Sequence, residues 1–115
     1  MQRAVNRWVL NNLANDNRLA MFTAIGHQGT HDSQAWISQR KLEGVRKGFP
    51  DMMLLVPSGK YSGLFIELKR SNGKATKEQK EWIENLNYYD YKAVIIKTDK
   101  PSEVVAVIKD YLGWE

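Results

Sequence analysis

The chain has 115 residues, of which 43% are hydrophobic, and its formal net charge is +4. This length and composition predict one folded domain over residues 1–115 and exclude a largely disordered chain. Because the sequence has no cysteine, disulfides and cysteine-ligated zinc are excluded as well. No apolar run is long enough to span a membrane, and none near Met1 has the form of a signal peptide, so we expect an intracellular, cytoplasmic protein with no membrane partner.

The first fifteen residues predict a helix. Val5, Val9 and Leu13 recur every four positions, as they would along one face of a helix. A turn-forming sequence follows at residues 15–17. Residues 19–25 then form an apolar run, which predicts a central strand of a sheet.

A polar loop over residues 26–33 follows this predicted strand and contains both histidines. The spacing of His27, His31 and Asp32 matches no common pattern of metal ligands, so we interpret both imidazoles as polar loop groups. His27 directly follows the strand and is kept as an auxiliary candidate for a site. A capping serine then predicts a helix over residues 33–42.

Two apolar runs in the middle of the chain predict a β-hairpin. Residues 52–56 and 64–69 each have the length of a strand, and a turn-forming sequence at 57–60 separates them. The connection is longer than two residues, so we expect an open hairpin loop. Side chains alternate across a strand, which places Glu67 and Lys69 on one face.

Asp51 stands at the start of the first hairpin strand, where strand pairing would bring it close to Glu67. Two such carboxylates suit Mg²⁺ or Mn²⁺, because these ions prefer oxygen ligands and leave room for water and substrate phosphate. Lys69 would orient an attacking water or offset charge on the scissile phosphate. The alternative is an ordinary surface strand with alternating charges, and the Pro50–Asp51 pair ahead of it favours the metal site.

Basic residues flank this hairpin, with Arg46 and Lys47 before it and Arg70 and Lys74 after it. Cations in loops beside a carboxylate site would contact a nucleic-acid backbone. The net charge of +4 also fits a phosphate-bearing partner. The alternative is a solvated run of charge.

Thr76 begins the next predicted helix, and Gln79 has two interpretations. Thr76-X-X-Gln79 is a capping box, in which the glutamine bonds back to the first residue of the helix. Gln79 also shares a helix face with Trp82 and Leu86, which would direct it toward the strand ends and the site. Both roles stay open at this point.

Residues 91–97 are almost continuously hydrophobic in their middle part and predict a buried central strand. The last helix begins at Pro101, a residue suited to a first helical turn, and ends at Gly113. The complete order is α-β-α-β-β-α-β-α. It predicts an α/β fold in which helices flank a mixed β-sheet.

Three segments resemble the VRR-Nuc (virus-type replication-repair nuclease) domain of the PD-(D/E)XK nuclease superfamily. Residues 44–51 end in Pro-Asp, residues 63–69 contain Glu-X-Lys, and residues 76–82 read Thr-X-X-Gln-X-X-Trp. The resemblance covers roughly residues 44–112, and its motifs occur in the family's order. It implies a restriction-endonuclease-like fold.

The resemblance also implies an activity, namely metal-dependent hydrolysis of DNA phosphodiesters. Asp51 and Glu67 would hold Mg²⁺ or Mn²⁺ with the backbone carbonyl of Leu68, and Lys69 and Gln79 would complete the catalytic group. Stand-alone relatives are small, virus-encoded and often dimeric. The resemblance therefore implies a homodimer acting on branched DNA, such as Holliday junctions.

One departure from the family concerns the first helix. Many relatives carry a further acid there, whereas residues 1–15 contain neither Asp nor Glu. Gln2 lies near the expected position, and Asp32 is a candidate substitute. A second hypothesis is therefore a catalytically weak or silent nucleic-acid-binding module on the same fold. A third is a recombination or tRNA-junction enzyme of the same superfamily.

Overall fold

The computed structural model describes residues 1–25, 44 and 46–115. The predicted helix over residues 33–42 lies outside this part of the chain, as do His27 and Asp32. In chain order the elements are α1 (Gln2–Asn11), the 3₁₀ helix η1 (Asn17–Met21), β1 (Phe22–Ala24), β2 (Met52–Leu54), β3 (Leu64–Lys69), α3 (Lys77–Tyr88), β4 (Lys92–Lys97) and α4 (Pro101–Leu112). No helix within the described ranges is long and apolar enough to cross a membrane.

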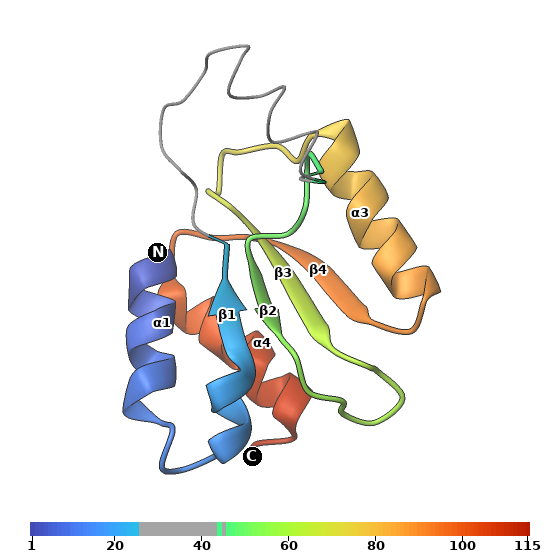
Figure 1. The fold of residues 1–115 in the computed structure, drawn as a ribbon. Coiled ribbons are helices and arrows are strands. Elements are labelled where there is room, and N and C mark those ends of the chain that lie inside the picture. Colours follow the sequence, from blue (N-terminus) through green and yellow to red (C-terminus); the bar gives the residue numbers. More distant parts are fainter. Residues whose placement is uncertain (26–43, 45) are drawn as a thin grey trace.

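The four strands form one mixed sheet in the order β1-β2-β3-β4 (Figure 1). Strands β2 and β3 form the predicted hairpin, β1 pairs antiparallel with β2, and β4 pairs parallel with β3. The predicted α/β class, with a mixed sheet flanked by helices, is therefore confirmed.

Two of the predicted strand positions are wrong. Residues 19–25 and 91–97 were expected in central strands, but β1 and β4 lie at the two edges of the sheet that the structure describes. The hydrophobic run in β4 has a different cause. Its residues are covered on both faces, with Ala93 in the cluster of α3 and Val94 and Ile96 packed against the cluster of α4. Cover on the two faces of an edge strand gives the same sequence pattern as a central position.

Helices cover the two faces of the sheet. The larger core joins α1 and α4 to one face through residues such as Val5, Met52, Ile66 and Ile108, all at most 1% exposed. The smaller core joins α3 to the opposite face and is built around Phe65, Leu86 and Ala93. Figure 1 shows α1 and α4 together on one side of the sheet and α3 on the other.

The beginning of the chain differs from its prediction in two boundaries. The first helix ends at Asn11 rather than near residue 15, and a 3₁₀ helix occupies residues 17–21, which includes the first three residues of the strand expected over 19–25. The cause of the second difference is a local cap, because the carboxylate of Asp16 accepts a hydrogen bond from the backbone N–H of Arg18. Asp16 is thus the N-cap of this short helix.

The same Asp16 carboxylate ties the two ends of the chain together. It accepts hydrogen bonds from Arg18 Nη2 at 2.7 Å and from Trp114 Nε1 at 2.8 Å. The Trp114 ring lies 5.5 Å from the ring of Trp8 on α1, and the Lys109 ammonium lies over both rings. These contacts hold the end of α4 against α1.

Candidate active site

The hairpin register places Asp51 and Glu67 on the same face of the sheet. Met53 is directly opposite Phe65 in the β2–β3 pair. Asp51 precedes Met53 by two residues and Glu67 follows Phe65 by two, so all four side chains point to the α3 side. A register shifted by one residue would have sent one carboxylate to the other face.

Asp51 is fixed by the neighbouring strand. Its Oδ2 atom accepts a hydrogen bond of 2.9 Å from the backbone N–H of Leu68, and the residue is only 7% exposed. This bond continues the pairing of β2 with β3 by means of a side chain. The direction in which the Asp51 carboxylate points is therefore set by the backbone of the strand that carries Glu67.

Glu67 is more deeply buried, at 2% exposure. Its Oε2 atom accepts a hydrogen bond of 3.0 Å from Gln79 Nε2 and lies 3.7 Å from the Lys69 ammonium. Its Oε1 atom is buried and has no hydrogen-bond partner in the described part of the chain. A buried carboxylate oxygen without a donor is costly, which indicates a position that a cation can fill.

Aromatic rings explain why this carboxylate is so poorly solvated. Phe65 precedes Glu67 on the same face, and its ring lies 5.9 Å from that of Phe49. Phe49 in turn packs against Trp82 of α3 at 4.9 Å between ring centroids. This aromatic group closes the space between the sheet and α3 beside the two carboxylates.

The burial of Glu67 changes its acidity. Burial raises the pKa of Glu67 from 4.5 to about 8, and the charge of Asp51 acts in the same direction. The Lys69 ammonium partly opposes both effects on this pKa. Near neutral pH the pair therefore favours holding a proton, unless a cation takes its place.

The donor set fits a hard divalent ion. Two carboxylates that face one another, one of them with an unpartnered oxygen, match the needs of Mg²⁺ or Mn²⁺, which keep several positions for water and substrate. Across residues 1–25, 44 and 46–115, no third acidic, histidine or cysteine side chain joins them. Helix α1 supplies no acid in its first turn, and Gln2 makes no hydrogen bond to the two carboxylates within that same part of the chain.

Gln79 performs both of the roles that its sequence position allowed. Its Oε1 atom accepts a hydrogen bond from the backbone N–H of Thr76, while the Thr76 hydroxyl accepts one from the backbone N–H of Gln79. Its Nε2 atom meanwhile donates to Glu67. The capping box and the contact with the site are therefore compatible, because an amide has a separate acceptor and donor.

Comparisons with known proteins agree with this geometry. The model of the VRR-NUC domain family matches residues 4–100. The chain belongs to the VRR-NUC domain family. A solved structure described as a "VRR_NUC domain protein" is 28% identical, with a TM-score of 0.75 over 96% of this chain and 87% of that chain. No curated protein matches the sequence. The match spans both carboxylates, Lys69 and Gln79, so the site lies within the VRR-NUC domain.

The basic residues expected to bind DNA lie around this site in different settings. Lys47 is paired with Glu78 at 3.3 Å, and Arg46 lies over the Trp82 ring at 5.9 Å. Arg70 and Lys74 are exposed in the connection between β3 and α3. Their contact with DNA stays a prediction, as does the role of the Leu68 carbonyl.

One basic residue beside the site was missed by the sequence analysis. Lys97 is the direct partner of Lys69 in the parallel pairing of β3 and β4. In the sequence, Lys97 is recognisable only as the last residue of the hydrophobic run that forms β4. Its closeness to Lys69 follows from the parallel pairing of β4 with β3, which the sequence alone does not give.

Proposed function

We propose that this VRR-NUC domain is an endonuclease that hydrolyses DNA phosphodiesters with the help of Mg²⁺ or Mn²⁺. The observation that carries the proposal is the buried pair of Asp51 and Glu67, with one carboxylate oxygen unpartnered and Lys69 alongside. Such a group has little structural value, because a buried carboxylate oxygen without a donor costs stability. A role in binding and chemistry accounts for its presence.

Each residue of the site has a distinct part in this reaction. Asp51 and Glu67 would hold the ion, which when bound supplies Lewis acidity toward the phosphate and lowers the pKa of water. Gln79 keeps the Glu67 carboxylate in one orientation through the hydrogen bond to Oε2. Lys69 directs its ammonium toward Oε2 and is 20% exposed, so it also reaches a substrate placed over the pair.

The bond changes are those of hydrolysis. The oxygen of an attacking water forms a bond to phosphorus, and the bond from phosphorus to the leaving sugar oxygen breaks. Negative charge grows on the phosphoryl oxygens as this occurs, and the Lys69 ammonium stabilises it or orients the water. The proton released by the water goes to solvent, and the leaving oxygen takes one up.

The net charge of +4 and the exposed Arg70 and Lys74 support DNA as the substrate. Preference for branched DNA and a homodimeric state are further parts of the proposal. A two-fold dimer would present two sites to two strands, which suits cleavage of a four-way junction.

The test is a Mn²⁺ titration on linear, flapped and four-way DNA. We expect cleavage by the wild type and a loss of at least about a hundredfold in kcat for Asp51→Asn, Glu67→Gln and Lys69→Met. Lys60→Gln serves as the control, because Lys60 lies exposed in the hairpin loop at the far end of β2 and β3. Full cleavage by Glu67→Gln would contradict the proposal.

The second candidate function is a DNA-binding module without catalysis. It is favoured by one observation, that only two acids meet at the site in the part of the chain that the structure describes. Such a module would bind the same DNA panel in Mn²⁺ without cutting it. Glu67→Gln would then bind DNA as well as the wild type does.

A further inference from the structure

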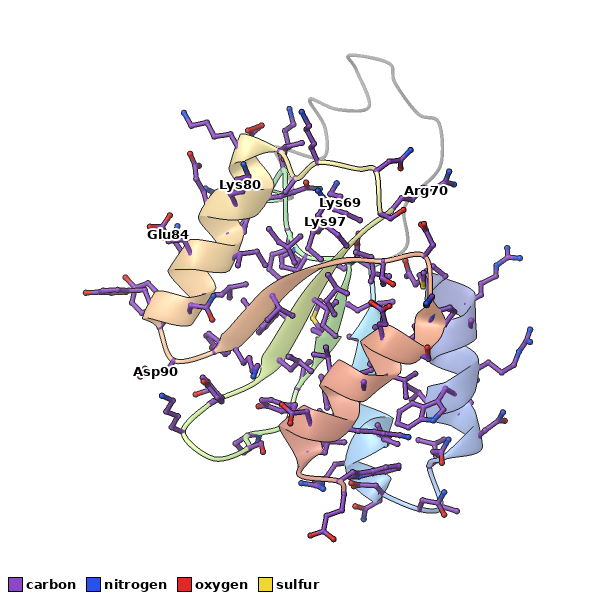
Figure 2. All side chains as sticks on the ribbon, turned by 180° about the vertical axis from the view of Figure 1, so that it is seen from behind. Lys69, Arg70, Lys80, Glu84, Asp90 and Lys97 are labelled. Carbon is purple, nitrogen blue, oxygen red and sulfur yellow. The ribbon has the colours of Figure 1, made fainter. Side chains whose placement is uncertain are left out.

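Lys97 lies beside the catalytic lysine of the proposed site. In the parallel β3–β4 pair, Glu67 is opposite Ile95 and Lys69 is opposite Lys97. Paired residues of neighbouring strands point to the same face and lie about 4.8 Å apart. Figure 2 shows Lys69 and Lys97 next to each other at one end of the sheet, with Arg70 beyond them.

The two lysines differ in what surrounds their charge. The Lys69 ammonium is mostly covered and pairs with Glu67. Lys97 is exposed, and no acid in the described part of the chain lies within ion-pair distance of it. The acid two residues further on, Asp99, instead accepts hydrogen bonds from the backbone N–H and the hydroxyl of Ser71.

A phosphate bound over the two carboxylates has neighbours along the same DNA strand. A strand that crosses from β2 over β3 meets β4 next, where Lys97 is the cation on the α3 face. Because Lys97 has no ion-pair partner among the described residues, a phosphate at this point gains an attraction without breaking an ion pair within that part of the chain.

We propose that Lys97 binds the phosphate adjacent to the scissile one, and so directs the cleaved strand across β3 toward β4. This inference rests on the proposed nuclease function. It makes Lys97 a positioning residue, which acts by fixing the path of the strand rather than by touching the reacting atoms. The alternative is a solvated surface lysine without contact to DNA.

Lys92 provides a matched control on the same strand. It stands at the other end of β4, opposite Leu64, and therefore points to the α4 face, with its ammonium 5.6 Å from the Tyr61 ring. Both residues are lysines of one edge strand. Replacing either by glutamine removes the same charge from the chain, so only the position differs.

The first measurement is DNA binding in a chelator, followed by fluorescence anisotropy between 50 and 200 mM salt. For Lys97→Gln we expect the slope of log affinity against log salt to fall by about 0.9, the value for one lost duplex phosphate contact. We expect Lys97→Arg to restore the slope and Lys92→Gln to leave it unchanged. Equal melting temperatures of the variants would show that all of them are folded.

The second measurement is cleavage in Mn²⁺, where Lys97→Gln should raise KM with a smaller change in kcat than Lys69→Met. Identical salt slopes for Lys97→Gln and Lys92→Gln would overturn the inference, whether or not the protein cuts DNA. A reduced slope in a protein that cuts no DNA would support the Lys97 contact and reject the nuclease. Cleavage of DNA by the wild type together with an unchanged salt slope for Lys97→Gln would support the nuclease and reject the Lys97 contact.

Discussion

The side chain of Gln79 donates a hydrogen bond of 3.0 Å to the carboxylate of Glu67 while its other end closes the first turn of α3. One amide therefore connects the start of a helix to the most buried acid of the sheet. The position of the Glu67 carboxylate depends on where α3 begins, and the helix start is itself defined by Thr76.

Separate substitutions of Thr76 and Gln79 should distinguish the contribution of the helix cap from that of the hydrogen bond to Glu67. Thr76→Ala should lower the free energy of unfolding by about 1 kcal/mol, because one helix N–H loses its partner. Gln79→Ala should cost a similar amount and also weaken Mn²⁺ binding by at least tenfold, since it leaves Glu67 unsupported. Denaturant unfolding and calorimetric Mn²⁺ titration measure the two effects. Equal Mn²⁺ affinity in the two variants would show that the hydrogen bond to Glu67 has no role in the site.

The raised pKa of Glu67 predicts a pH-dependent stability of the metal-free protein. Between pH 4.5 and about 8 the folded protein holds a proton that the unfolded chain releases. The free energy of unfolding should therefore fall as pH rises through this window and level off above it. Among the described residues, the groups that face Glu67 are Asp51, Lys69 and Gln79, and the charge of Asp51 strengthens the effect.

Urea unfolding in a chelator from pH 5 to pH 9 measures this dependence, and Glu67→Gln should remove most of the slope. Mn²⁺ competes with the proton for the same carboxylates, so its stabilising effect should be larger at pH 8.5 than at pH 6. A stability that rises with pH across this window in the wild type would contradict the assignment.

Gly48 should be intolerant of a side chain. Its φ is +88°, and a Cβ atom there would lie 2.7 Å from the backbone carbon of Glu78 and 2.8 Å from the backbone nitrogen of Gln79. Gly48→Ala should cost about 3 kcal/mol, as strain and overlap act together. Gly59→Ala, with φ of +57° and open space around it, should cost roughly 1 kcal/mol. Thermal unfolding of the two variants checks this, and equal losses would show that the approach of the loop to α3 is looser.

The contacts of Asp16 should make the protein sensitive to acid. The hydrogen bonds from Arg18 and Trp114 hold the pKa of Asp16 well below its usual value of 3.8. A depressed carboxyl pKa contributes stability that is present above pH 3.8 and is lost as pH falls below it. Asp16→Asn should therefore lower the melting temperature at pH 7, and less so at pH 2.

Trp114→Phe keeps an aromatic ring against Trp8 but removes the indole N–H that Asp16 accepts. Its melting temperature at pH 7 should lie between those of the wild type and Asp16→Asn, because the bonds from Arg18 remain. A Trp114→Phe protein that melts below Asp16→Asn would show that the ring itself, rather than the hydrogen bond, joins the two ends.

The part of the fold that was predictable is the part governed by local patterns. The hairpin, the capping box at Thr76 and the last helix between Pro101 and Gly113 follow from turn chemistry and periodicity. The edge position of β4 was missed because the hydrophobicity of a strand shows whether its two faces are buried. It does not show whether another strand pairs on each side. The 3₁₀ helix was missed because Asp16, its N-cap, was interpreted only as part of the turn over residues 15–17.

The candidate site shows the same division. Pairing of Asp51 with Glu67 was predictable from the alternation of two short strands, and the structure brings them to one face together with Lys69. The unpartnered oxygen of Glu67 and the position of Lys97 depend on burial and on strand order. Neither burial nor strand order can be read from a local stretch of sequence.

The lysines of β4 also bear on how two copies of the chain can meet. Side-to-side joining of two β4 strands would bring together two edges that each carry a lysine on both faces, Lys92 on the α4 face and Lys97 on the α3 face. Lysines on an edge strand discourage the merging of sheets, because joining would bring these charges close together. A dimer of this protein should therefore form through another surface and leave this margin of the sheet open to the solvent.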